Sequence, residues 1–332
     1  MRYNGSMGLF SDKIRVGVLR GGPSGEYDVS LNTGMAVLES LSADIYQPID
    51  IFISKNGDWH EEGFSKQPEK ILKKIDVAWN ALHGNYGEDG TVQKLLDSFG
   101  VPYTGSNSSA SAVSYDKVAS KKEYKRAGIK TPVGTHINLK DLTRDAIREV
   151  YKTLPPPYVV KPASSGSSLG VRIASSLPEL EEAVVAAFEY SPAVIIEEYI
   201  KGREATCGVV DEFRGSHHHA LLPIEIKPKS HFFNYESKYA DGGAEEICPG
   251  NFSKEEKDMI EGMAIMAHSV LGLRHYSRSD FIVHPKRGVY ILETNTLPGL
   301  TKNSLIPKAL RAAGSSLSEF LHHVISLALD RK

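Results

Sequence analysis

The 332-residue chain contains only two cysteines, Cys207 and Cys248, and they form no CxxC pair. This spacing predicts neither a thiolate zinc site nor a disulfide framework. The chain also has no apolar run of the roughly 20 residues that a membrane-spanning helix needs. We therefore expect a protein without a membrane partner that works in a reducing, cytoplasmic compartment.

An excess of charge of one sign is also missing. The chain has 39 lysines and arginines against 41 aspartates and glutamates, for a formal net charge of -2. Without a positive field over the whole molecule, we expect no nucleic acid partner, and any anionic ligand must be bound by a local group of residues. Residues 1–12 lack the hydrophobic stretch of a secretory signal, and we expect them to form a flexible extension.

The length of the chain allows two or three compact lobes. Short apolar strands alternate with helical segments in the N-terminal third, which predicts an α/β lobe with a parallel sheet at residues 13–115. The glycine turn at 21–25 lacks the spacing of a dinucleotide fingerprint and does not favour a nicotinamide enzyme. The character of the sequence changes at Asp116. We expect further lobes at 116–197 and 198–332, the last of which ends in packing helices at 304–313 and 317–329.

Two apolar strands expected near the C-terminus carry polar side chains at alternating positions. Glu293 and Asn295 lie two residues apart and point to the same face of one strand, as do Arg278 and Asp280 on the other. If the strands are neighbours, their carboxylate and amide oxygens converge, and magnesium prefers such ligands beside nucleotide phosphates. The alternative is two polar strand ends in solvent. The cation beside the acids favours a metal site of Asp280, Glu293 and Asn295.

A loop of small residues at 163–170 joins two expected strands, at 158–161 and 171–173. Its backbone amides and hydroxyls could close over phosphates, with Lys161 beneath them. A flexible surface loop is the alternative interpretation. The lysine on the preceding apolar strand favours phosphate binding.

Three consecutive histidines, His217, His218 and His219, follow an expected turn at 214–215. Such a run can bind metal ions. Because it adjoins the turn, we interpret it as a solvated loop and assign it no role.

A series of short motifs resembles the D-alanine--D-alanine ligases, a family of the ATP-grasp superfamily. The motifs span nearly the whole chain in the family's order, which makes the match far more specific than any single motif. In chain order they are Gly21-Gly22-Pro-Ser-Gly-Glu26-Tyr-Asp-Val-Ser30, Leu82-His83-Gly84 with Gly87-Glu-Asp-Gly90, Lys117, Lys161 with Gly166-Ser167-Ser168, Glu197, Glu204, Lys238-Tyr239, Arg278-Ser-Asp280 and Glu293-Thr-Asn295. The resemblance implies a Rossmann-like parallel-sheet lobe followed by the two-lobed ATP-grasp fold.

The resemblance also implies a reaction. ATP converts one D-alanine to D-alanyl phosphate, the amine of a second D-alanine attacks it, and ADP and phosphate leave. The product would feed peptidoglycan precursor synthesis in a bacterial cytoplasm, and the enzyme would be a homodimer. The alternatives are another ATP-grasp ligase that acts on a different carboxylate and amine, a ligase that makes D-alanyl-D-serine or D-alanyl-D-lactate, and a non-catalytic ATP-binding protein on this fold, as in synapsin.

Roles for the ATP-binding residues follow from the resemblance. Two Mg²⁺ ions, or Mn²⁺, would be held by Asp280, Glu293 and Asn295 and would bridge the phosphates. The remaining residues divide by the part of ATP that they would bind: Lys117, Lys161, Ser168 and Lys238 the phosphates, Glu197 with the backbone near Tyr199 and Ile200 the adenine, and Glu204 the ribose.

The resemblance places the two D-alanines as well. Glu26 would bind the ammonium group of the first, with His83 nearby. Ser304 and the amide of Leu305 would hold the carboxylate of the second, where the start of a helix favours an anion. An ordinary helix cap is the alternative for Ser304, and the two interpretations are compatible.

The remaining catalytic residues would stabilise and shield the intermediates. Arg278 and the amide of Gly299 would stabilise the oxyanion of the tetrahedral intermediate. Tyr239 would join a hydrogen-bond network with Ser167 and Glu26, so that the polar segment around it closes the site and excludes water. A tyrosine at this position, after Lys238, favours a dipeptide product.

Overall fold

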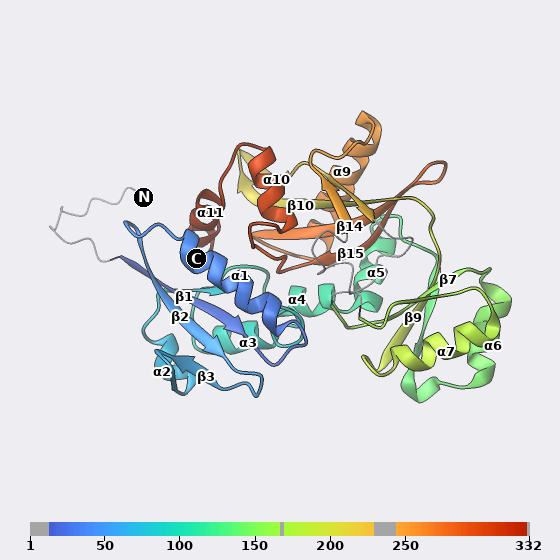
Figure 1. The fold of residues 1–332 in the computed structure, drawn as a ribbon, viewed down its shortest axis with the longest axis horizontal. Helices are drawn as coiled ribbons and strands as arrows, with labels where there is room; N and C mark the ends of the chain where they lie inside the picture. Colours follow the sequence, from blue (N-terminus) through green and yellow to red (C-terminus); the bar gives the residue numbers. More distant parts are fainter. Residues whose placement is uncertain (1–12, 167–168, 229–243, 331–332) are drawn as a thin grey trace.

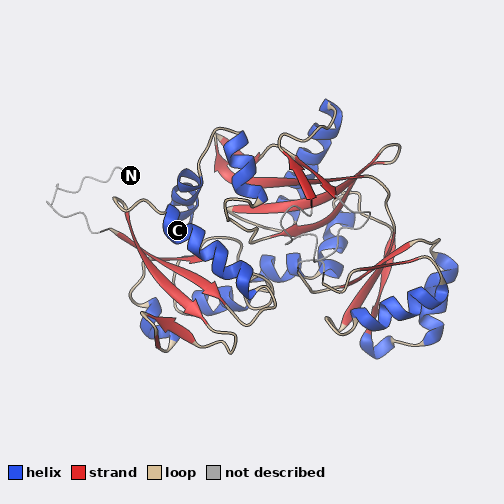
Figure 2. Ribbon diagram, in the orientation of Figure 1, coloured by secondary structure: helices blue, strands red, loops and turns tan. Residues whose placement is uncertain are grey.

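The computed structural model describes residues 13–166, 169–228 and 244–330. In this part of the chain the strands form three sheets that follow one another along the sequence (Figures 1 and 2). The first sheet is mostly parallel and the other two are antiparallel, as expected for an α/β lobe followed by α+β lobes. The exact lobe boundaries at 115/116 and 197/198 stay a prediction. None of the described helices combines the length and the apolar character needed to cross a membrane.

The first sheet has the strand order β4-β3-β2-β1-β5, and β1 is parallel to both β2 and β5. Its elements are β1 (Ile14–Gly21), α1 (Tyr27–Ser40), β2 (Tyr46–Ile53), β3 (Trp59–Glu61), β4 (Phe64–Ser65), α2 (Pro68–Leu72), β5 (Val77–Asn80) and α3 (Thr91–Ser98). Residues 16–19 of β1 and 77–80 of β5 are buried without interruption, which suits a sheet that is covered on both faces.

The turn after β1 depends on glycine. Gly21 has a φ of 92°, and a Cβ there would lie 2.3 Å from the carbonyl oxygen of Ile53 on β2. Only glycine accepts this conformation and this close approach. The hydroxyl of Ser30 on α1 accepts a hydrogen bond from the Gly21 amide at 2.8 Å and donates one to the carbonyl of Ala81 at 2.9 Å. The start of α1 is thereby fixed above the ends of β1 and β5.

The second sheet, of strand order β6-β9-β7-β8, carries α6 and α7 on one face (Figure 1). Its elements are β6 (Gly134–Asn138), a 3-10 turn (Leu139–Asp141), α6 (Arg144–Thr153), β7 (Tyr158–Pro162), β8 (Arg172–Ala174), α7 (Leu177–Ala187) and β9 (Ala193–Glu198). Thr143 and Ser176 begin the two helices by accepting hydrogen bonds from backbone amides. Val160, Val184 and Ile196 are fully buried between sheet and helices.

The third sheet has the order β13-β12-β10-β14-β15, and β11 pairs with β10. Its elements, with the helices that pack on it, are α4 (Ser108–Tyr115), α5 (Lys117–Arg126), β10 (Arg203–Phe213), β11 (Ser216–Ala220), β12 (Ile224–Pro228), β13 (Ala244–Ile247), α9 (Lys254–Val270), β14 (Tyr276–His284) and β15 (Gly288–Asn295). The loop predicted for His217, His218 and His219 is wrong, because these residues lie on β11.

The two closing helices join the first and third sheets. They are α10 (Leu305–Ala312) and α11 (Leu317–Leu329), and the packing role expected for both is confirmed. Phe320 on α11 packs edge to face against Trp79 of β5 at 6.3 Å and Tyr276 of β14 at 5.3 Å, measured between ring centroids. All three side chains are almost completely buried. One apolar core therefore holds the ends of the two sheets together.

Truncation of this aromatic contact should destabilise the protein strongly. We expect Phe320→Ala to lower the free energy of unfolding by about 3–5 kcal/mol, since it removes a buried ring and leaves a cavity. Phe64→Ala is the control, because Phe64 is 70% exposed and its loss should cost about 0.5 kcal/mol or less. Urea unfolding followed by circular dichroism measures both, and equal effects of the two changes would contradict the shared core.

Candidate active site

A cluster of charged side chains lies where β14 and β15 run side by side. Asp280 pairs across the strands with Glu293, and Arg278 with Asn295. The guanidinium group of Arg278 donates to both carboxylate oxygens of Asp280, at 3.0 and 2.8 Å. The amide of Asn295 donates to Asp280 at 3.3 Å, and the hydroxyl of Thr206 on β10 at 2.6 Å. The two strands are thus neighbours, as predicted, and four hydrogen bonds fix the Asp280 carboxylate.

Lys117 connects this cluster to the second sheet. It is the first residue of α5, where the carboxylate of Asp116 caps the helix. Its ammonium group lies 3.3 Å from the Glu293 carboxylate and donates at 2.7 Å to the carbonyl of Ser165, in the loop after β7. Helix α5, the loop and β15 line a small hollow together with Glu88, Ser114, Tyr115, Gly166, Thr294, Asn295 and Thr296.

A second buried group of charges lies between α5 and the second sheet. The carboxylate of Glu197 on β9 forms ion pairs with the ammonium groups of Lys121 at 2.6 Å and Lys161 at 2.8 Å, and all three residues are buried. Burial raises the pKa of Glu197, but the two lysines outweigh burial and hold this pKa below its usual value. Burial also lowers the pKa of Lys121 to about 8, against the opposing effect of Glu197. With two cations and one anion, the group can accept an anionic ligand.

The residues expected around adenine and ribose follow β9. Tyr199 is 41% exposed and donates its backbone amide to the carbonyl of Pro157, whereas Ile200 is buried against Ile282. Glu204 lies on β10, paired with Ile282 of β14. The structure places them at the connection between the second and third sheets.

Glu26 reaches the site from the N-terminal side, at the start of α1. A Cβ on Gly84 would lie 2.8 Å from its Oε2, and a Cβ on Gly166 only 2.1 Å from the same atom. Side chains at either position would collide with the carboxylate. The two glycines, one following β5 and one following β7, therefore make room for Glu26 between the first and second sheets.

His83 lies deeper in the same region. It is buried, and its Nε2 lies 2.9 Å from the hydroxyl of Thr33 on α1. Burial, together with the charge of Arg278, lowers the pKa of His83 to about 4, so the imidazole is neutral at pH 7.

Gly299 and Ser304 face each other in the segment between β15 and α10. A Cβ on Gly299 would approach the Ser304 hydroxyl to 3.0 Å. Ser304 stands at the N-cap of α10, but its hydroxyl contacts that of Thr301 at 2.8 Å and makes no capping bond. The ordinary cap considered for Ser304 is therefore not formed by its side chain.

Sequence reasoning missed Glu88, which links two loops of the site. Its buried carboxylate accepts hydrogen bonds from the amides of Gly84 at 2.9 Å and Leu297 at 3.3 Å. Burial, reinforced by the charge of Glu26, raises the pKa of Glu88. The signal was present in the motif Gly87-Glu-Asp-Gly90, to whose acids we gave no role. Lys121 was missed as well, although it lies one helical turn after Lys117.

Comparison with known families identifies this arrangement. The model "D-ala D-ala ligase C-terminus" matches residues 123–326, and "D-ala D-ala ligase N-terminus" matches 15–71 and 60–106. The D-alanine--D-alanine ligase of Clostridium beijerinckii is 39% identical over 96% of this chain and 100% of its own length. That of Geobacter sulfurreducens is 38% identical over 94% and 93%. The chain belongs to the D-alanine--D-alanine ligase family.

Solved structures of this ligase family share the fold. D-alanine--D-alanine ligase from Bacillus anthracis has a TM-score of 0.80 at 36% identity, covering 95% of this chain and 97% of its own. The VanG D-Ala:D-Ser ligase from Enterococcus faecalis has a TM-score of 0.84 at 29% identity, covering 96% and 100%. The Bacillus anthracis ligase is also solved in complex with ATP. The predicted fold class and family are confirmed, and the protein is an ATP-using ligase.

Four of the residues predicted for the ligase site, Ser167, Ser168, Lys238 and Tyr239, lie outside the described residues. Their roles stay predictions. The remaining predicted residues lie on strands of the second and third sheets, at the starts of α1, α5 and α10, and in the loops described above.

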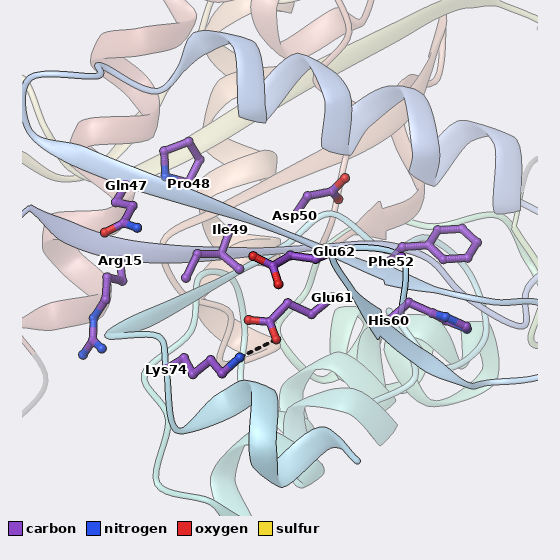
Figure 3. A pocket seen from close by; sticks show the side chains of 11 residues that line it. Arg15, Gln47, Pro48, Ile49, Asp50, Phe52, His60, Glu61, Glu62 and Lys74 are labelled. Carbon is purple, nitrogen blue, oxygen red and sulfur yellow. Dashed lines mark hydrogen bonds and ion pairs between the residues drawn. The ribbon is translucent and has the colours of Figure 1, made fainter. Parts of the chain in front are cut away.

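A larger hollow of the ligase lies on the N-terminal sheet, apart from the charged cluster (Figure 3). Its residues come mainly from β2 and β3, and Lys74 is paired there with Glu61 at 2.6 Å. Its other lining residues are Arg15, Gln47, Pro48, Ile49, Asp50, Phe52, His60, Glu62 and Gly63. Since none of the described site residues lines it, its size does not make it the candidate active site.

The neutral state of His83 predicts a loss of stability in acid. The unfolded chain binds a proton near pH 6.5, whereas folded His83 does so only near pH 4. The stabilisation is therefore complete above pH 6.5 and is lost as the pH falls towards 4, by about 2 kcal/mol between pH 7 and pH 5. In His83→Gln this part of the pH dependence should disappear in urea unfolding, whereas the exposed His136→Gln should keep it. If the free energy of unfolding of His83→Gln depends on pH as it does in the unchanged protein, this would contradict a buried neutral imidazole.

Proposed function

We propose that this ligase joins two D-alanines into D-alanyl-D-alanine through a D-alanyl phosphate, with release of ADP and phosphate. The observation that carries the proposal is the fixed group of Arg278, Asp280, Glu293 and Asn295 on β14 and β15. The carboxylate and amide oxygens of this group can bind a cation, and the guanidinium group of Arg278 beside them can stabilise an oxyanion. Glu26, which can bind an amino group, lies close to Gly84 and Gly166 in the adjoining loops.

The metal site is part of this proposal. Asp280, Glu293 and Asn295 offer carboxylate and amide oxygens, the donors that suit Mg²⁺ or Mn²⁺, and they would hold two ions. In the structure, Arg278 pairs with Asp280 and Lys117 pairs with Glu293. The group therefore offers partners to both a metal cation and an anionic phosphate. The metal would neutralise charge on the phosphates of ATP.

The nucleotide would lie between the second and third sheets. Lys117 and Lys161, with Lys238 and Ser168, would bind the phosphates, and Lys121 adds a cation beside Lys161. Glu197, the backbone near Tyr199 and Ile200, and Glu204 would bind adenine and ribose. Phosphoryl transfer needs positioning and charge neutralisation above all, which is what these groups supply.

The two amino acids would lie on the N-terminal side of the nucleotide. Glu26 would orient the ammonium group of the first D-alanine, with neutral His83 beneath it, and Ser304 with the amide of Leu305 would hold the carboxylate of the second at the start of α10. The Ser304 hydroxyl makes no capping bond, and it can donate to a carboxylate while it accepts a hydrogen bond from the Thr301 hydroxyl.

Two groups of residues would assist peptide-bond formation. Arg278 and the amide of Gly299 would stabilise the oxyanion. Tyr239 and Ser167 would join Glu26 in the network that closes the site and keeps water from the acyl phosphate.

The second amino acid is the part of the substrate that needs a direct test. A relative of similar fold is named a D-Ala:D-Ser ligase, whereas the curated relatives cited above are named D-alanine--D-alanine ligases. Tyr239 favours the dipeptide of two D-alanines. A non-catalytic ATP-binding protein would not need the partly buried Arg278 beside its metal ligands.

We further propose that the enzyme is a homodimer through its N-terminal lobe and acts in the cytoplasm, in peptidoglycan precursor synthesis. Light scattering of the purified protein should give twice the monomer mass. A monomer mass at the concentrations used for the assay would refute the dimer and leave the reaction untouched.

The reaction is tested by ADP release from the purified protein with Mg²⁺ and ATP. The samples contain D-alanine, L-alanine, D-serine with D-alanine, D-lactate with D-alanine, or no amino acid, and products are identified by mass. We expect release that depends on D-alanine, with D-alanyl-D-alanine as the main product. If D-alanyl-D-serine or D-alanyl-D-lactate is the main product, the second substrate is D-serine or D-lactate instead of D-alanine. ATP binding without ADP release in any sample would refute the ligase activity.

Removal of one proposed metal ligand should stop the reaction. We expect Glu293→Gln to lower kcat at least about 100-fold, because the neutral amide holds a divalent cation poorly. Glu62→Gln is the matched control at an exposed glutamate of the N-terminal lobe, and it should turn over normally. The same ADP assay measures both variants, and an undiminished rate for Glu293→Gln would exclude this residue as a metal ligand.

A further inference from the structure

A second cluster of metal-binding side chains lies on the third sheet, where β10 ends. Asp211 of β10 and His218 of β11 are cross-strand partners, and His268 reaches them from α9. The Asp211 carboxylate oxygen Oδ1 lies 2.8 Å from Nδ1 of His218 and 3.0 Å from Nε2 of His268. The three ligand atoms all lie within 4.8 Å of one another. They come from three different elements and meet at one point.

The orientation of His268 sets this cluster apart from an ordinary hydrogen-bonded group. Its side chain is completely buried, and its Nδ1 lies 2.8 Å from the hydroxyl of Ser277. Its Nε2 is close to Asp211, yet it forms no hydrogen bond of acceptable geometry with any described residue. Its partner is Oδ1 of Asp211 at 3.0 Å, a contact without the alignment of a good hydrogen bond. Metal-bound histidines commonly use one ring nitrogen for the ion and the other for a hydrogen bond, and His268 is arranged in this way.

The carboxylate is held in place as a metal ligand would be. The amide of His275 donates to Oδ2 of Asp211, and the backbone carbonyl of Asp211 accepts from Nε2 of His323 at 2.7 Å. The first contact leaves Oδ1 facing the two imidazoles. Supporting hydrogen bonds of this kind orient the carboxylate ligands of metal sites.

We propose that Asp211, His218 and His268 bind one Zn²⁺ ion. Two imidazole nitrogens and one carboxylate oxygen suit this ion, whereas the oxygen-only group of Asp280, Glu293 and Asn295 suits Mg²⁺. Bonds of about 2.1 Å in a tetrahedron put ligand atoms roughly 3.4 Å apart, so the measured 2.8 and 3.0 Å need to open by only a few tenths of an ångström. Water would occupy the fourth position, because the His218 side chain is 19% exposed.

The ion would have a structural role. It would cross-link α9 to the paired strands β10 and β11, which α9 otherwise contacts through apolar side chains such as Val209 and Ile260. Its site is separate from the proposed active site, since Asp280 pairs with Thr206, five residues before Asp211 on the same strand. The proposal therefore does not depend on the ligase reaction.

Zinc binding by the full-length chain, freed of metal with a chelator, tests the proposal. Competition with a zinc-sensitive dye gives affinity and stoichiometry, excess Mg²⁺ blocks the oxygen-only site, and thermal unfolding with and without zinc gives a second readout. We expect one Zn²⁺ per chain and a rise in Tm that Mg²⁺ alone does not produce. In place of zinc, Co²⁺ should show the visible absorption of tetrahedral coordination. No zinc bound, or binding without a rise in Tm, would overturn the proposal.

Two variants and a matched control assign the ligands. His218→Ala, at a partly exposed strand position, should lower zinc affinity at least about 100-fold and abolish the rise in Tm. His268→Gln should do the same, and if burial of the new side chain prevents folding, His218→Ala still decides the question. His217→Ala is the control, because His217 neighbours His218 but points to the opposite face of β11, 79% exposed. Equal zinc affinity in His218→Ala and His217→Ala would overturn the proposal.

Discussion

The ion pair between Arg278 and Asp280 is the interaction on which the candidate site depends. Both side chains lie on β14, two residues apart, so the strand itself sets their geometry. Burial would lower the pKa of Arg278, but the charge of Asp280 outweighs burial and raises it, so the guanidinium stays charged inside the protein. Its field then acts across the site: it lowers the pKa of His83 and opposes the rise in the pKa of Glu88. One strand of the third sheet thereby contributes to protonation in the first lobe, where burial is the larger cause for both groups.

The site also depends on close backbone approach between lobes. Cβ atoms at positions 84 and 166 would displace the Glu26 carboxylate from its place, and Glu88 accepts hydrogen bonds from the backbone amides of Gly84 and Leu297. These contacts carry little apolar area. Ala81 and Leu297, which lie next to or within the two loops that Glu88 links, belong to the same core cluster as Trp79, Tyr276 and Phe320. Site geometry and core packing are therefore coupled.

Much of this arrangement could be predicted from the sequence, because strand alternation is a local pattern. Alternation placed Arg278 and Asp280 on one face of one strand, and Glu293 and Asn295 on one face of a second strand. The structure shows that these two strands are neighbours. The motif order gave the family and the fold. The rest depends on tertiary contacts: Lys121 on α5 meets Glu197 of the second sheet, and β11 forms by pairing with β10. A run of three histidines has no alternation of polarity, so nothing local indicated a strand there.

The charges of the site are paired in a way that suits exchange for a nucleotide. Lys117 lies against Glu293, and Lys161 and Lys121 lie against Glu197. Buried ions left alone are costly, so each group must keep a partner before and after ATP binds. Under the proposed function, a phosphate would replace Glu293 beside Lys117 while metal ions take over Glu293, and the surplus positive charge of Lys121 and Lys161 would meet a second phosphate while Glu197 keeps its lysine partners. The pairs seen in the structure thus prepare the site for ATP at little electrostatic cost, and they explain how a chain with a net charge of only -2 can hold so anionic a substrate.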